Sequence, residues 1–131
     1  MQRGGKRLEG NRINLEQRRI RYLRDILPIR LGGLAANLSR IASFAQHDGH
    51  QEVVRSILKE SRWFIEWTAA ELETTRAAEP VRLQIQLAVW ELQIESNWDD
   101  EAWRRQLVSG ARQRSERLME MSGLPESASD S

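Results

Sequence analysis

The chain of 131 residues contains no cysteine, only three prolines and no long run of apolar residues. The lack of cysteine excludes a disulfide framework and a thiolate metal site, and it fits a reducing cytoplasm. No apolar stretch approaches the roughly 20 residues that a membrane-spanning helix needs. The N-terminal residues lack an apolar segment, so we expect no secretory signal. These absences together favour a cytoplasmic protein with a single folded domain.

The motifs of common enzyme sites are absent as well. The sequence has no Gly-x-Ser-x-Gly nucleophile elbow, and its paired glycines do not follow a strand as a phosphate-binding loop requires. Both histidines lie in one cluster with an acid, formed by His47, Asp48 and His50. This cluster could supply metal ligands, but it lacks the Glu-x-x-His spacing of di-iron bundles, and a polar turn is the preferred interpretation. We therefore expect no enzyme activity, no cofactor and no small-molecule substrate.

Charge is unevenly distributed although the net charge is only +1. Residues 1–30 contain nine basic and three acidic side chains, whereas residues 48–101 contain twelve acids and five bases. Such asymmetry can steer a charged partner. The alternative is that the basic N-terminal helix packs beside the acidic middle helices of the same chain.

Apolar periodicity predicts an all-α fold. We expect a bundle of four main helices plus a short N-terminal helix that starts at Asn14 and ends near Pro28. The main helices are predicted at about residues 28–46, 51–78, 80–96 and 100–121. Residues 1–12 are expected to form a disordered basic arm, 13–122 the helical bundle, and 123–131 a disordered tail.

The segment 31–45 carries a single charge, Arg40, and is predicted to lie at the centre of the bundle. Its bulky stripe consists of Leu34, Leu38, Ile41 and Ala45. A second stripe of small residues should allow close approach of the last helix at its narrow waist, Gly110 and Ala111. If that small stripe is exposed instead, it becomes a candidate dimer face. The small stripe consists of Gly32, Ala36, Ser39 and Ser43.

One segment is ambiguous between strand and helix. Residues 81–89 alternate apolar and polar side chains, which is typical of a strand. The same region also contains two series with helical spacing. A lone strand would have no partner, and Pro80 suits the first turn of a helix, so we predict a helix and keep the strand as the alternative. The two helical series are Leu83, Leu87, Trp90 and Ile94, and Val81, Ile85, Ala88 and Leu92.

The chain has five tryptophans but only two phenylalanines and one tyrosine. Trp63 and Trp67 lie one helical turn apart, and Trp98 lies in a short acidic connection where we expect it to be exposed. Tryptophan and arginine are enriched at binding hot spots, so these three side chains are candidate partner-binding residues. The alternative is that the tryptophans pack in the core.

Arg18, Arg19 and Arg21 form the densest part of the basic N-terminal third. They are candidate partner-binding residues as an electrostatic patch. Several arginines could also neutralise phosphates of a nucleic acid. Tyr22 is the one aromatic residue among them, so the stacking platform of single-strand binders is missing. Nucleic-acid binding is therefore the secondary hypothesis.

The sequence from Leu27 to Phe44, followed by Glu-Ser-Arg-Trp-Phe-Ile-Glu-Trp-Thr-Ala, resembles small uncharacterised helical proteins of cyanobacteria. The resemblance covers about residues 27–70 and includes no catalytic motif. It implies a bacterial cytoplasmic protein and carries no activity, cofactor or partner to this chain. The sequence as a whole predicts a non-enzymatic protein–protein interaction module, either an adaptor, a regulator or a homodimer.

Overall fold

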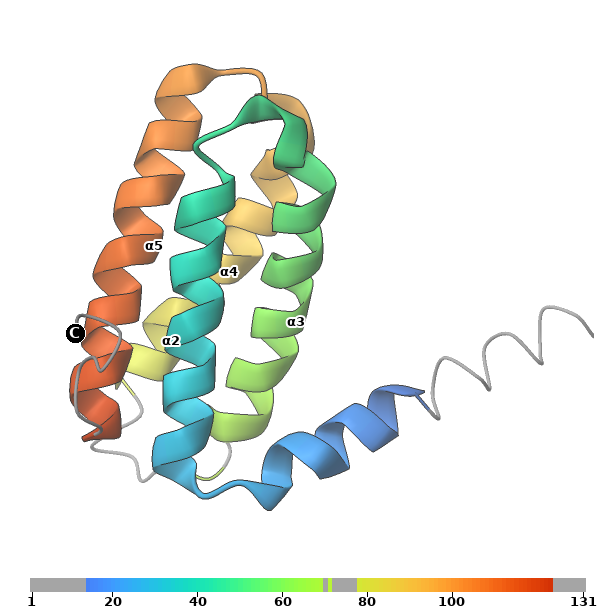
Figure 1. Ribbon diagram of the computed structural model, residues 1–131, viewed down its shortest axis with the longest axis vertical. Coiled ribbons are helices and arrows are strands. Elements are labelled where there is room, and N and C mark those ends of the chain that lie inside the picture. Colours follow the sequence, from blue (N-terminus) through green and yellow to red (C-terminus); the bar gives the residue numbers. More distant parts are fainter. Residues whose placement is uncertain (1–13, 70, 72–77, 124–131) are drawn as a thin grey trace, which may run out of the picture.

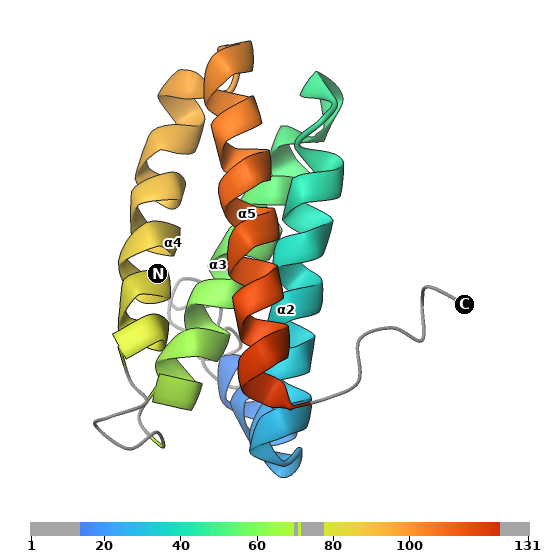
Figure 2. The same cartoon turned by 90° about the vertical axis from the view of Figure 1, so that its left-hand side faces the viewer.

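The computed structural model describes residues 14–69, 71 and 78–123. Over these residues the protein is an all-α bundle, which confirms the predicted fold class. Its main helices run alternately up and down, and the N-terminal helix, residues 14–24, projects from one end (Figures 1 and 2). The further elements are α2 (Leu27–Phe44), the 3₁₀ turn η1 (Asp48–His50), α3 (Gln51–Ala69), α4 (Ala78–Asn97) and α5 (Glu101–Ser122).

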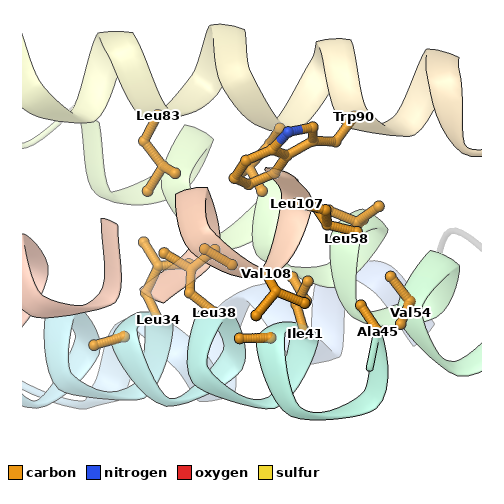
Figure 3. Close-up of a cluster of buried hydrophobic side chains, with 14 of the residues drawn as sticks. Leu34, Leu38, Ile41, Ala45, Val54, Leu58, Leu83, Trp90, Leu107 and Val108 are labelled. Atoms are coloured by element: carbon orange, nitrogen blue, oxygen red, sulfur yellow. The ribbon is translucent and has the colours of Figure 1, made fainter. Parts of the chain in front are cut away.

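Helix α2 is the most enclosed element, as the sequence predicted. Pro28 lies in its first turn, where the missing amide proton of proline is not needed. The predicted bulky stripe is fully buried. Figure 3 shows these side chains facing Leu83 and Trp90, which point toward them from α4 on the opposite corner of the bundle. The buried stripe consists of Leu34, Leu38, Ile41 and Ala45.

The predicted contact of the small stripe with α5 is wrong. Ala36, Ser39 and Ser43 are exposed, and Gly32 is half-buried. Helix α2 does make its closest pairing with α5, but it presents a neighbouring row of small residues that includes the buried Ala35. The hydroxyl of α5 residue Ser115 donates to the carbonyl of Ala35 at 2.8 Å. The interface is therefore rotated by about one residue from the predicted one.

Gly110, one of the two residues of the predicted α5 waist, faces α4 and not α2. A Cβ atom placed on Gly110 would lie 2.9 Å from Cζ2 of Trp90 on α4. Gly110 therefore makes room for an indole ring of α4, whereas the adjacent Ala111 is fully buried in the core.

Helix α3 ends at Ala69, nine residues before the predicted end at Ala78. The carbonyl of Thr68 accepts a hydrogen bond from the amide of Glu71 at 3.0 Å, which closes a turn. The turn allows the Glu71 carboxylate to pair with Arg30 at the start of α2. Residues 70 and 72–77 of the predicted helix lie outside the described residues.

Helix α4 resolves the strand–helix ambiguity in favour of the helix, with Pro80 in its first turn. The next connection leads into α5, where Asp100 is the N-cap and its side chain accepts from the amides of Ala102 and Trp103. Gly123 ends α5 in the left-handed conformation at φ 70°. The predicted arm, residues 1–12, and the tail beyond Gly123 lie outside the described residues.

Candidate functional site

Four aliphatic side chains form an exposed row along the outer face of α4. Their exposed fractions are 45% for Val81, 61% for Ile85, 37% for Val89 and 82% for Leu92. Ala88 lies between them and is half-exposed. Steps of three and four residues along a helix return to the same face, so these side chains lie in one line. We call this row the α4 outer face.

The same alternation that imitates a strand creates this face. A step of two residues rotates by about 200° around a helix, so alternate apolar residues point in opposite directions. Leu83 and Leu87 therefore point into the core, whereas Val81 and Ile85 point away from it. Helix α4 is thus apolar on two opposite faces. The core of the bundle covers one of these faces, and the described residues leave the other exposed.

On the side toward α3, the charges that border the α4 outer face are already paired. The Glu91 carboxylate lies 3.2 Å from Nε of Arg62, and Glu95 forms an ion pair with Arg55. At longer range, the electrostatic fields of two opposite charges this close together largely cancel. The border is therefore polar but carries little net charge.

On the side toward α5, three guanidinium groups share one carboxylate. Glu79 forms ion pairs with Arg114, with Arg117 at 3.4 Å and with Arg82 at 3.7 Å. Farther along α4, the side-chain oxygen Oε1 of Gln93 accepts from the indole N–H of Trp103 at 3.0 Å. Both borders of the α4 outer face are thus fixed by contacts within the chain.

Trp98 is buried, with 3% of its surface exposed, so the prediction that it is the exposed tryptophan is wrong. Its indole N–H donates to the carbonyl of Asp48 at 2.6 Å, and the Arg104 guanidinium lies 5.5 Å from its ring centroid. The side chain closes one end of the bundle by joining the α4–α5 connection to the turn before α3. A tryptophan held in this way offers no surface to a partner.

Trp63 and Trp67 are half-buried on α3. Two cations lie near the Trp63 ring, with the Arg18 guanidinium 6.0 Å and the Lys59 ammonium 5.5 Å from its centroid. The Trp67 ring lies 5.9 Å from the ring of Tyr22. Both tryptophans therefore support the N-terminal helix, and each keeps part of its surface exposed.

Tyr22 anchors the N-terminal helix on α3. Its ring stacks on Phe64 with centroids 4.2 Å apart, and its hydroxyl lies 2.7 Å from Oγ1 of Thr68. Burial raises the pKa of the Tyr22 hydroxyl above its ordinary value of 10.0, although the Thr68 hydrogen bond and the Arg30 charge act in the opposite direction. The contact between the basic N-terminal helix and α3 is largely aromatic, and α3 itself carries as many bases as acids.

The three predicted arginines lie together on the exposed N-terminal helix. Arg19 pairs with Glu16 of the same helix at 3.0 Å, whereas Arg18 and Arg21 pair with no carboxylate in the described part of the chain. Arg18 and Arg21 line a hollow of about 410 Å³ whose wall also contains the acidic Asp25 and Glu60. The lining of this hollow therefore carries charges of both signs, whereas the rest of the arginine patch is basic.

The His47–His50 turn is occupied by structural contacts. The Asp48 carbonyl accepts from Trp98, and the His50 ring lies 5.2 Å from the ring of Phe44. Across residues 14–69, 71 and 78–123, no group of three or more histidine, cysteine or acidic side chains is placed to hold a metal ion.

A second hollow, of about 720 Å³, runs between the end of α2 and α5. Sequence reasoning did not identify it. Its floor includes Ala45 and Val108, and its walls carry charges of both signs, among them Arg105, Arg112 and Glu116. It is open and polar, and no set of converging groups distinguishes it as a binding site.

Comparisons with protein-family models, curated proteins and solved structures found no significant match for this chain. The resemblance of residues 27–70 to cyanobacterial proteins thus stays a prediction. In the described helices, none combines the length and apolar character that crossing a membrane requires. The α4 outer face therefore has to be judged from its own geometry.

Proposed function

We propose that this chain is a cytoplasmic, non-enzymatic interaction module that docks another protein against the α4 outer face. The proposal rests on the exposed aliphatic row that consists of Val81, Ile85, Val89 and Leu92. Single apolar residues on a protein surface are ordinary, whereas a contiguous exposed row marks an interaction site.

The size of the row limits the kind of partner that suits it. Full burial of an aliphatic side chain is worth about 1.5–3 kcal/mol, so covering the exposed fractions of these four contributes about 5 kcal/mol. Association costs about 4–15 kcal/mol in lost freedom of motion. A stable complex therefore needs a partner that brings comparable apolar surface of its own.

Two other surfaces offer less to a protein partner. The small stripe on α2 is exposed, as its alternative interpretation as a dimer face requires, but Ala36, Ser39 and Ser43 carry little apolar area. Trp63 and Trp67 are engaged by Arg18 and Tyr22 within the chain. Both surfaces thus rank below the α4 outer face.

Photocrosslinking tests the proposal without assuming who the partner is. A benzophenone amino acid is placed at Ile85 and, as a matched control, at the exposed Val53 on α3. Gln51 and Arg55 contact α4, and Val53 lies two residues from each, so it points away from α4. Illumination in extract of the native organism should give discrete protein adducts from position 85 and none from position 53. No adduct at position 85, or the same adducts at both positions, would contradict docking through α4.

A second candidate function is association with nucleic acid through the N-terminal helix. Its support is that Arg18, Arg21 and Arg24 are exposed and pair with no carboxylate within the described part of the chain. Binding should weaken steeply between two salt concentrations and be lost when residues 1–12 are removed and Arg18, Arg19 and Arg21 are changed to glutamine. Absence of binding at low salt would eliminate this function.

A further inference from the structure

We propose that the partner on the α4 outer face is a second copy of this chain, docked with its α4 antiparallel to the first. This inference rests on the proposed docking role of α4 and adds the identity and direction of the occupant. A second copy supplies the comparable apolar row that a stable complex needs. Such a pair has two-fold symmetry, so each contact occurs twice.

The sizes of the side chains favour the antiparallel direction. When the row is paired about its midpoint, Val81 lies opposite Leu92 of the second copy, and Ile85 lies opposite Ala88. Each layer then joins a larger side chain to a smaller one. A parallel pair would oppose Ala88 to Ala88 and leave a void, which packed interfaces avoid.

The polar borders are also compatible with this arrangement. In an antiparallel two-fold pair, each border meets the same border of the other copy. Gln84 then lies near Glu91 of the second copy, and Arg82 lies near Gln93. Amide groups can donate to the carboxylate and accept from the guanidinium. Glu91 and Glu95 are paired within their own chain, so no unpaired carboxylates are opposed at the border toward α3. At the border toward α5, Arg82 is paired with Glu79.

The position of α4 leaves room for the second copy. Helix α4 occupies the corner of the bundle opposite α2, with α3 and α5 on either side (Figures 1 and 2). The outer face points away from the core residues Leu83, Leu87 and Ile94. Two bundles can therefore meet corner to corner through α4 without displacing any described element.

Engineered cysteines test both the occupant and its direction, because the natural chain has none. Differently tagged Val81→Cys and Leu92→Cys proteins are mixed and oxidised, and Val53→Cys serves as the control. The expected product is a covalent dimer that joins one Val81→Cys chain to one Leu92→Cys chain. Antiparallel Val81→Cys pairs would be separated by roughly 16 Å along the axis, too far for a disulfide.

The other outcomes overturn the inference. Disulfides between identical variants would indicate a parallel pair, and the absence of any disulfide would indicate that a second copy does not dock. Sedimentation of the unsubstituted chain is a second readout of self-association, and it does not depend on the folding of any variant. In a separate measurement, Leu92→Gln should self-associate at least about 10-fold more weakly than the unsubstituted chain. If self-association fails while position 85 still crosslinks in extract, α4 docks another protein, and the proposed function stands without this inference.

Discussion

Two glycines in helix interiors should respond to alanine with opposite signs. Gly33 on α2 has no atom within 4 Å of an added Cβ, whereas a Cβ on Gly110 would lie 2.9 Å from Cζ2 and 3.4 Å from Cη2 of Trp90. Alanine gains about 1 kcal/mol over glycine in a helix. Overpacking a core contact costs about 1–3 kcal/mol. Gly33→Ala should therefore stabilise the protein by about 1 kcal/mol, and Gly110→Ala should destabilise it by up to about 2 kcal/mol.

Chemical unfolding followed by circular dichroism measures both free energies of unfolding. A change of 1 kcal/mol corresponds to roughly 3–5 °C in Tm for a chain of this size. Replacing Trp90 with phenylalanine removes the ring atoms that the new Cβ would meet. In that background Gly110→Ala should lose its penalty. Equal stabilisation by Gly33→Ala and Gly110→Ala would refute the packing of Trp90 against α5.

Three further outcomes follow from the site contacts. Trp98→Phe removes a buried hydrogen bond and should cost about 1–3 kcal/mol of unfolding free energy, whereas Trp103→Phe, whose indole bonds an exposed glutamine, should cost less than about 1 kcal/mol. Asp100→Ala removes the α5 N-cap and should lower stability by about 0.5–2 kcal/mol, with the neighbouring Asp99→Ala near neutral as the control. Tyr22 is the single tyrosine, so tyrosinate absorbance reports its pKa directly, which should lie above 10.0 in the folded protein. Because the unfolded state loses that proton first, stability should fall as the pH rises past about 10, and Tyr22→Phe should weaken this fall.

The helices could be predicted because their apolar stripes follow helical spacing over many residues. The stripe of α2 and Pro80 in the first turn of α4 are examples in which local chemistry and tertiary packing agree. The end of α3 was misplaced because helix-forming residues continue past Ala69 in the sequence. Near the end of α3, Thr68 contacts Tyr22 and Glu71 pairs with Arg30. These partners are distant in the sequence, so no local sequence pattern reveals them.

The faces of the helices were harder to predict than the helices themselves. Ala35 and Ala36 are adjacent and equally small, so the sequence could not show which of them meets α5. On α4 both helical series were visible, but Leu83 and Ile85 are equally apolar. Deciding which series is buried requires the positions of α3 and α5, which the sequence does not contain. Trp98 was misjudged because its acidic neighbours do not reveal the carbonyl that its indole reaches.

Sedimentation velocity over a concentration series tests most directly whether α4 docks a second copy. The unsubstituted chain should sediment faster as its concentration rises, and Val53→Gln and Ala36→Leu should behave in the same way. Leu92→Gln should associate at least about 10-fold more weakly. Its unfolding transition should match that of the unsubstituted chain at concentrations where that chain is monomeric, because Leu92 is exposed in the monomer. A chain that stays monomeric at every concentration, or a Leu92→Gln variant that associates as well as the unsubstituted chain, would contradict the account.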